Sequence, residues 1–342
     1  MALKIRNIER NINEVIDFIN KHIEQLGFIL PLPKEKILKY FPLENSYLIL
    51  LEDKIMGVFT YILGREKTAP TGYFRLITER AEYLEGILSF IIKKAVANEK
   101  LFLRTAIYGY KKNIMSNLIA HDSKVAAEIP EMVSFDGKLY SRIVLYVDLR
   151  DKYKFDVTRL YKSEELYPVK DVEKVDEYSF KVRGLRYQDL SIFEEIFNQN
   201  NVYRTMGSGV FEGLQYINRE IIWQNVLRKK LYTLTCIDEK KGIPIGFLSL
   251  SLYDEDVLKG VANLGMLVDE RYHGLGAGSL LMEKAILLAK RLHLRRICLS
   301  VFNVNPAGIR LYKKFGFEEH GSYPGWFQNG YIKEIFMSKK LS

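Results

Sequence analysis

The feature that most constrains this chain is a glycine-rich stretch at residues 268–282, which reads VDERYHGLGAGSLLM. Gly274, Gly276 and Gly278 stand there at every second position, between an apolar run at 264–268 and a helical apolar pattern at 279–292. This order predicts a strand, a tight turn and a helix. Glycines let a backbone approach a ligand closely because they have no Cβ, and the free N–H groups at a helix start attract anions. The stretch therefore predicts either a phosphate-binding loop or a tight turn with nothing bound.

A second motif follows at residues 305–317, which read NPAGIRLYKKFGF. Neither a P-loop nor the full dinucleotide fingerprint matches the glycine stretch. Arg271-x-x-Gly274-x-Gly276, taken with the second motif, instead resembles the two signatures of the GNAT superfamily of N-acyltransferases, the second being N-x-x-A-x-x-L-Y-x-x-x-G-F. Gly308 stands where that family has alanine, and we expect it to loosen the helix slightly. The resemblance covers residues 181–342, about half of the chain.

The apolar periodicity predicts the element order β, α, β, β, β, α, β, α, β, β in the first half of the chain, and the second half repeats it. The first helices are expected at residues 12–26, 83–96 and 112–127. We therefore expect an α/β (α+β, GNAT-like) fold of two tandem GNAT-like domains, each with a mixed, mostly antiparallel central sheet flanked by helices. The expected boundaries are 1–150 for a degenerate first domain, 151–178 for a charged connector and 179–342 for the catalytic domain. A structured extension packed on one domain is the alternative to a connector.

The two halves differ at the glycine loop. When Thr78 is aligned with Asp269, Tyr83, Glu85 and Ile87 fall opposite the three glycines. Their side chains would block the approach of a pyrophosphate, and a carboxylate would repel it. The first half also has no Leu-Tyr…Gly-Phe segment after residue 112. We therefore expect it not to bind acyl-CoA.

The resemblance implies acetyl-CoA as cosubstrate. Its pyrophosphate would bind the backbone amides of the loop, and its pantetheine arm would pair with the strand before the loop, as a peptide adds to an open sheet edge. Met266 and Val268 are the expected backbone partners, and an N–H near Leu267 would polarise the thioester carbonyl. Asn305 is either a helix N-cap or a cofactor contact, or both. The implied cofactor-binding residues are Met266, Leu267, Val268, Arg271, His273, Gly274, Leu275, Gly276, Ala277, Gly278 and Asn305.

Tyr312 matches the tyrosine that protonates the departing thiolate in the family, whereas outside the motif it would be read as core packing. An alkyl amine is mostly protonated at neutral pH and needs a base before it attacks. The strand before the loop carries no carboxylate, so the base stays open. The candidates are Asp254, Glu255, Asp256, Glu212 and a chain of water molecules.

The irregular segments should hold the acceptor. Tyr203 and Glu212 fall in the loop expected to face the substrate, and Trp326 falls in an aromatic tail that resembles the ending of polyamine and ribosomal-protein acetyltransferases. Cation–π contacts of Tyr203 and Trp326 with an amine, or plain packing, would explain these aromatic residues. The sequence thus predicts an N-acetyltransferase acting on a primary amine of a protein N-terminus, a lysine, a polyamine or a small metabolite. The alternative is an acyl-CoA sensor without turnover.

Composition limits the remaining possibilities. The net charge of +9 suits an anionic ligand, but basic and acidic residues are interspersed and do not predict nucleic-acid binding. No apolar run reaches the length of a membrane span, and the N-terminus has no signal-peptide core. Cys236 and Cys298 are expected as buried thiols in a cytoplasmic protein. His273 and His320 lack partners at ligand spacing, so no metal site is expected. A homodimer is one option for the oligomeric state.

Overall fold

The structure is a computed structural model, and it describes residues 4–8, 12–62, 71–152, 178–199, 218–327 and 330–341. The chain divides into two compact units. The first consists of Met1–Thr158 with Glu255–Leu258, and the second of Arg159–Asp254 with Lys259–Ser342. The expected connector at 151–178 lies almost wholly outside the described residues.

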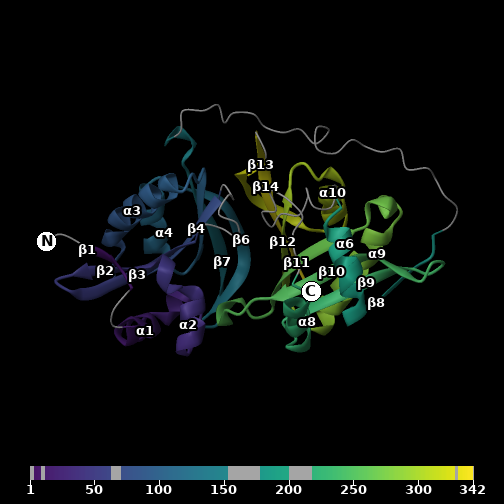
Figure 1. Ribbon diagram of the computed structural model, residues 1–342, viewed down its shortest axis with the longest axis horizontal. Helices are drawn as coiled ribbons and strands as arrows, with labels where there is room; N and C mark the ends of the chain where they lie inside the picture. Colours follow the sequence, from purple (N-terminus) through teal and green to yellow (C-terminus); the bar gives the residue numbers. More distant parts are fainter. Residues whose placement is uncertain are drawn as a thin grey trace. The chain divides into compact units, whose positions relative to one another are not determined.

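The first unit is a mixed sheet with helices on both faces (Figure 1). Its strands lie in the order β1-β2-β3-β4-β5-β7-β6. Only β4 and β5 are parallel, and the other neighbours are antiparallel. The elements are β1 (Lys4–Asn7), α1 (Ile12–Lys21), the 3-10 helix η1 (Ile23–Leu26), α2 (Lys34–Tyr40), η2 (Leu43–Asn45), β2 (Ser46–Leu51), β3 (Lys54–Ile62), β4 (Thr71–Thr78), η3 (Ala81–Tyr83), α3 (Leu84–Ala97), β5 (Phe102–Tyr108), α4 (Lys112–Ala120), β6 (Ser123–Phe135), β7 (Lys138–Asp148), η4 (Arg150–Lys152) and η6 (Asp256–Leu258).

The second unit has the same plan, with the strand order β8-β9-β10-β11-β12-β14-β13 and one parallel pair, β11 with β12. Its described elements are β8 (Phe180–Gly184), η5 (Tyr187–Asp189), α6 (Leu190–Phe197), α8 (Arg219–Leu227), β9 (Leu231–Asp238), β10 (Ile243–Leu252), β11 (Val261–Val268), η7 (Glu270–Tyr272), α9 (Ala277–Arg291), β12 (Arg296–Phe302), α10 (Pro306–Lys314), β13 (Glu318–Phe327) and β14 (Gly330–Lys340). The element order expected from periodicity is found in both units, except that among the described residues each has one more helix before its second strand, α2 in the first and α8 in the second.

Each sheet has two apolar cores, one on each of its faces. In the second unit, α9 and α10 cover one face through a cluster that includes Leu264, Leu281 and Ile297. On the other face, α6 and α8 pack against Phe247 and Leu267. In the first unit, α3 and α4 cover one face and α1 and α2 the other. A strand buried on both faces reads as a nearly continuous apolar run, which is why 264–268 gave a clear signal.

Two expected helices end early. The helix expected at 12–26 stops at Lys21, and η1 follows and ends at Gly27, whose left-handed φ of 80° suits glycine. The helix expected at 112–127 ends at Ala120, and β6 begins at Ser123. Asp122 adopts a left-handed φ of 67° there, which stops a helix. Residues 123–127 read SKVAA, which suits a helix or a strand, and the pairing with β7 makes them a strand.

The alignment of the two halves at the loop is also corrected. Gly57 pairs with Thr78 across β3 and β4, and Gly246 pairs with Val268 across β10 and β11. Thr78 therefore corresponds to Val268, and not to Asp269 as the sequence alignment assumed. The side chains expected opposite the glycines consequently do not lie there.

Candidate active site

The strands β11 and β12 diverge near the middle of the second sheet. Their parallel ladder runs only from Val261 paired with Arg296 to Asn263 paired with Cys298. Beyond it, β11 continues to Val268 on β10, and β12 continues to Phe302 on β14. The backbone edges that face each other past Asn263 are therefore outside the ladder. We call this part of the sheet the β11–β12 divergence.

The register shows which groups of β11 face this divergence. The Asp269 N–H donates to the Ile245 carbonyl at 2.8 Å. Because hydrogen-bonded and non-bonded pairs alternate in an antiparallel ladder, Leu267 also bonds with β10, while Met266 and Val268 direct their backbone groups the other way. The amide at Leu267 is thus engaged within the sheet, unlike the free oxyanion donor expected from the sequence. Met266 and Val268 direct their backbone groups toward the β11–β12 divergence.

The glycine loop follows η7 as residues 273–276 and leads into α9. Gly274 and Gly276 have left-handed φ values of 78° and 98°, and a Cβ on either would meet no atom within 4 Å. Within the described part of the chain, the amides of Gly274, Gly276, Ala277, Gly278 and Ser279 have no hydrogen-bond acceptor. These N–H groups and the positive end of the α9 dipole form an anion-binding arrangement.

Gly278 has a different environment from the other two glycines. It lies in the first turn of α9, where a Cβ would be 3.3 Å from Leu311 Cδ2 and 3.8 Å from Met266 Cε. It therefore lets α9 pack closely against α10 and β11, in addition to offering its N–H. The spacing of the glycines alone could not separate these roles.

Polar contacts hold the start of the loop. The Arg271 guanidinium forms a bidentate ion pair with buried Asp269, with Nη2 and Oδ2 2.5 Å apart. Burial raises the pKa of Asp269, but the hydrogen bonds from Arg271 outweigh this and leave the pKa below 3.8. The Tyr272 hydroxyl donates to Asp238 at 2.9 Å and accepts from Lys241 at 3.1 Å. These contacts tie the loop to the β9–β10 hairpin.

The His273 ring turns back onto the strand. Its Nε2 donates to the Val268 carbonyl at 2.9 Å. Of the two groups that Val268 directs toward the divergence, the carbonyl is therefore engaged and the N–H is left. Within the described residues that N–H has no acceptor.

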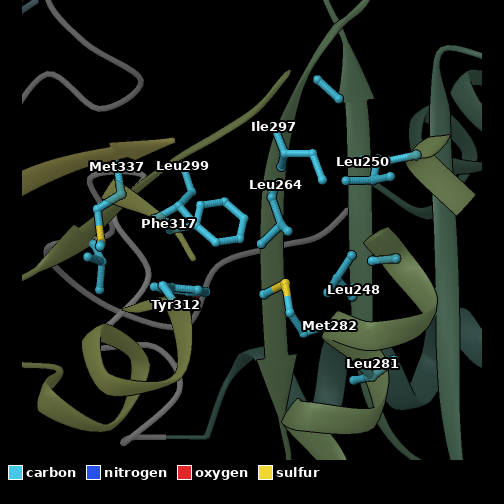
Figure 2. Close-up of a cluster of buried hydrophobic side chains, with 14 of the residues drawn as sticks. Leu248, Leu250, Leu264, Leu281, Met282, Ile297, Leu299, Tyr312, Phe317 and Met337 are labelled. Atoms are coloured by element: carbon cyan, nitrogen blue, oxygen red, sulfur yellow. The ribbon is translucent and has the colours of Figure 1, made fainter. Parts of the chain in front are cut away.

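Tyr312 lies on α10 in the core cluster that also holds Leu264 and Met282 (Figure 2). Its ring contacts Phe317 with centroids 5.8 Å apart. Only 7% of its surface is exposed, and burial raises the pKa of Tyr312 to about 12. Among the described residues its hydroxyl has no hydrogen-bond partner. The hydroxyl is therefore protonated at neutral pH and available to a ligand.

Asn305 caps α10. Its Oδ1 accepts from the Gly308 N–H at 2.8 Å, and Pro306 occupies the first helical position. A Cβ on Gly308 would lie 2.8 Å from the Asn305 side chain. Glycine at this position therefore leaves room for the cap, which explains the departure from alanine better than a general loosening of the helix.

The candidate bases are not brought together. Asp254 is paired with Lys230. Glu255–Leu258 groups with the first unit, where Asp256 accepts from the Ile29 N–H at 3.1 Å. On β11, Asn263 and Gly265 are the exposed positions, and neither is acidic. Tyr203 and Glu212 lie outside the described residues, and for Trp326 the structure describes the backbone in β13 but not the side chain.

Two broader features were checked over the described ranges. They contain no group of three or more His, Cys, Asp or Glu side chains that could hold a metal ion. None of the helices there is long and apolar enough to cross a membrane.

Residues 195–317 match the sequence model of the acetyltransferase (GNAT) family. The C-terminal half of the chain is a GNAT domain. It is 33% identical over 109 residues to the L-amino acid N-acetyltransferase AaaT of Escherichia coli, covering 31% of this chain and 65% of that protein. It is 36% identical over 100 residues to a spermine/spermidine N(1)-acetyltransferase of Bacillus subtilis, covering 28% and 66%. The chain thus spans about two thirds of the length of these relatives.

Solved structures of acetyltransferases are similar to about half of the chain. A ribosomal-protein-alanine N-acetyltransferase from Brucella melitensis has a TM-score of 0.41 and 22% identity, over 47% of this chain and 99% of that one. A phosphinothricin acetyltransferase from Sinorhizobium meliloti in complex with acetyl-CoA has a TM-score of 0.42 and 18% identity, over 48% and 89%. GNAT acetyltransferases use acetyl-CoA as cosubstrate.

Proposed function

We propose that the GNAT domain transfers an acetyl group from acetyl-CoA to a primary amine by direct attack in a ternary complex. The observation that carries the proposal is the continuity of two features. The unbonded amides of Gly274 and of residues 276–279 follow β11 after the single turn η7, and β11 offers the outward backbone groups of Met266 and Val268. An anion site joined to an open strand edge suits a diphosphate that continues into an amide-containing arm.

The binding step follows from these groups. The diphosphate would accept hydrogen bonds from the loop amides, with exposed Arg271 at its side. The pantetheine amides would pair with Met266 and with the Val268 N–H. The thioester carbonyl would then lie along β11 toward Gly265, which carries no side chain and has open space around it. Asn305 would act as the cap of α10, and contact with the cofactor would be an addition to that role.

The chemical step conserves atoms and charge. The amine nitrogen attacks the thioester carbon, the carbon–sulfur bond breaks, and the sulfur leaves with its electron pair. Tyr312 donates a hydrogen bond, and then its proton, to that sulfur. Because its pKa is about 12, Tyr312 carries the proton at neutral pH. The proton lost by the attacking amine passes through a base or through water and finally restores the hydroxyl, so the products are an amide and free CoA.

The base and the acceptor are proposed only as classes. Because exposed Asn263 and Gly265 provide no carboxylate on β11, a chain of water molecules or Glu212 would take the amine proton. The acceptor would be an amino group on an amino acid, a polyamine, another small metabolite or a protein. The named relatives act on amino acids and on spermine or spermidine, which supports a small amine.

One observation favours a second candidate function. The absence of a carboxylate on β11 would also suit a protein that binds acyl-CoA without turnover. The unbonded Tyr312 hydroxyl supports catalysis instead, because a sensor has no need of a proton donor in its core.

A thiol-release assay separates these two candidates. The full chain is incubated with acetyl-CoA and a panel of amino acids, polyamines and peptides, and free CoA is measured with a thiol reagent. We expect amine-dependent release with at least one member of the panel. Tight acetyl-CoA binding without release would support the sensor, and no binding at all would overturn both.

We also propose that residues 1–150 form a second GNAT-like domain that does not bind acyl-CoA, with 179–342 as the catalytic domain, and that the protein is cytoplasmic. The shared strand order of the two units supports the first part of this proposal. The two units also share one parallel pair, β4 with β5 and β11 with β12. Titration of the full chain with acetyl-CoA tests it, with one site per chain expected.

A further inference from the structure

The first unit contains its own strand divergence, and we propose that a segment of the same chain occupies it. The parallel ladder of β4 and β5 runs only from Thr71 paired with Phe102 to Tyr73 paired with Arg104. This is three residue pairs, as in the β11–β12 ladder. We call residues 23–27, which comprise η1 and Gly27, the plug. The plug makes the contacts with the first unit that a pantetheine arm would make with the second.

On β4 the plug is bound through Gln25. The Thr78 N–H donates to Gln25 Oε1 at 3.2 Å, and Gln25 Nε2 donates to the Thr78 carbonyl at 3.0 Å. The side-chain amide thus satisfies both backbone groups that Thr78 directs away from β3. Thr78 is the counterpart of Val268 in the strand register, so an amide of the chain itself stands where an amide of a bound ligand would pair.

On the β5 side the plug is bound through residues at the end of the strand. The Tyr108 hydroxyl donates to the Leu26 carbonyl at 3.1 Å, and the Tyr110 hydroxyl donates to the Glu24 carbonyl at 2.7 Å. Lys111 also pairs with the Glu24 carboxylate at 3.1 Å. The plug is therefore hydrogen-bonded on both sides of the divergence. Without it, the backbone groups of Thr78 and the hydroxyls of Tyr108 and Tyr110 would need a ligand or water as partner.

The plug is also packed closely against the first unit. Ile23 and Leu26 are buried in the core under α1 and α2. A Cβ on Gly27 would lie 2.6 Å from the Tyr108 hydroxyl, so the plug approaches β5 as closely as a glycine allows. Arg75, at the register position of exposed Gly265, lies over the Tyr40 ring at 4.5 Å and donates to the Tyr40 carbonyl. The plug thus bonds the edge of β4 that faces the divergence, and the Arg75 side chain with Tyr40 covers the position that corresponds to exposed Gly265.

This inference rests on the proposed function only for the identity of the carrier, acetyl-CoA. The new claim is that the Thr78 N–H and carbonyl are hydrogen-bonded by Gln25 of the same chain, whereas the Val268 N–H has no acceptor among the described residues. The two amides should therefore respond differently to acetyl-CoA, and residue-resolved amide hydrogen exchange on the full chain measures both at once.

In the free protein we expect the Thr78 amide to exchange at least tenfold more slowly than the Val268 amide. Saturating acetyl-CoA should slow Val268 at least tenfold and leave Thr78 unchanged. The variant Gln25→Ala should speed exchange at Thr78 at least tenfold and leave the CoA release rate of the full chain unchanged. Asn20→Ala is the matched control, because the Asn20 side-chain amide bonds both backbone groups of Leu32 in the same way. It should not affect Thr78.

Fast exchange at Thr78 in the wild-type free protein would overturn the plug, and so would protection of Thr78 by acetyl-CoA or a second binding site per chain. These readings do not require the variant to fold. If acetyl-CoA protects neither amide and no thiol is released, the proposed function fails, whereas slow exchange at Thr78 in the free protein would still support the plug.

Discussion

The connection from β4 to α3 and the connection from β11 to α9 start alike and end differently. The backbone N–H of Glu79 donates to the Met56 carbonyl just after β4, and the backbone N–H of Asp269 donates to the Ile245 carbonyl just after β11. Each strand is followed by a single 3-10 turn, η3 or η7. In the first unit α3 then begins at Leu84, directly after that turn, whereas residues 273–276 separate η7 from α9.

The two parallel ladders, β4 with β5 and β11 with β12, show how much the two connections differ in length. From Thr71 to its partner Phe102 the chain advances 31 positions, and from Val261 to its partner Arg296 it advances 35. The second connection is therefore four residues longer. Three of the four precede the helix, because the chain advances five positions from Glu79 to Leu84 and eight from Asp269 to Ala277, and the fourth lengthens α9 to 15 residues against 14 in α3. The first unit lacks the anion loop rather than holding it filled with side chains. A helix that begins directly after the turn has no glycines to bend the backbone toward a diphosphate.

The largest expected effect comes from the loop itself. Gly276→Glu adds a carboxylate at the anion site and a side chain at a φ of 98°, which only glycine adopts readily. We expect acetyl-CoA binding to weaken at least 1000-fold, or about 4 kcal/mol, by calorimetry. Gly137→Glu is the matched control, since Gly137 also has a left-handed φ and open space but lies in the β6–β7 turn. Equal loss in both variants would contradict an anion site at the loop.

The next comparison concerns the proton donor. Counted from the paired strands β5 and β12, Leu118 is the counterpart of Tyr312, and Leu118 is buried and cannot donate a proton. Tyr312→Phe should lower kcat about 100-fold, or about 2.7 kcal/mol, and change acetyl-CoA affinity less than threefold. Leu118→Met should change neither. Steady-state kinetics and calorimetry check both, and a loss of affinity with kcat preserved would remove Tyr312 from the chemistry.

Alkaline pH should reveal the ionisation of Tyr312 as a loss of stability. The pKa of Tyr312 rises from 10 to about 12 on folding, because burial disfavours the phenolate. Its contribution to stability is complete below pH 10 and is lost as the pH rises through 12, since the unfolded chain releases this proton first. At pH 11 the loss should be about 1.4 kcal/mol. Denaturant unfolding of the wild type and of Tyr312→Phe at pH 7 and pH 11 measures it. Equal alkaline losses in the two proteins would contradict the raised pKa.

The smallest effect concerns the two helix starts. Asn305 caps α10 with its side chain, whereas Lys111, at the start of α4, forms no side-chain cap. Asn305→Ala should destabilise the second unit by about 1 kcal/mol, measured by denaturant unfolding, and Asn305→Ser should restore most of it. Unchanged acetyl-CoA affinity in both variants would limit Asn305 to capping, while a weaker affinity in Asn305→Ser would show a contact with the cofactor.

Much of the fold could be predicted because the relevant forces are local. The apolar periods of α9 and of β11 appear directly in the sequence, and the chain order of elements follows from them. Tyr312 and the loop glycines could be found because two motifs occur together at a fixed distance. The end of the helix at Ala120 could not be predicted, since residues 123–127 suit a helix or a strand until β7 pairs with them.

The plug was not predictable either. Gln25 and Thr78 are 53 residues apart, and nothing near either residue marks them as partners. The same holds for Tyr110 and Glu24, which are 86 residues apart. Periodicity extended one helix over 12–26. In the structure the helix ends at Lys21, and Leu26 and Gly27 contact Tyr108, a residue more than 80 positions away in the chain.

By itself the sequence determined where backbone can bend and where it must be buried. Glycine conformational freedom and the spacing of apolar side chains are properties of each residue and its near neighbours, so they placed the loop, its helix and the tyrosine segment. Only the tertiary structure decided which backbone N–H groups keep a partner. Whether Thr78 and Val268 are satisfied depends on what lies across a diverging pair of strands, and that is set by contacts between residues far apart in the chain.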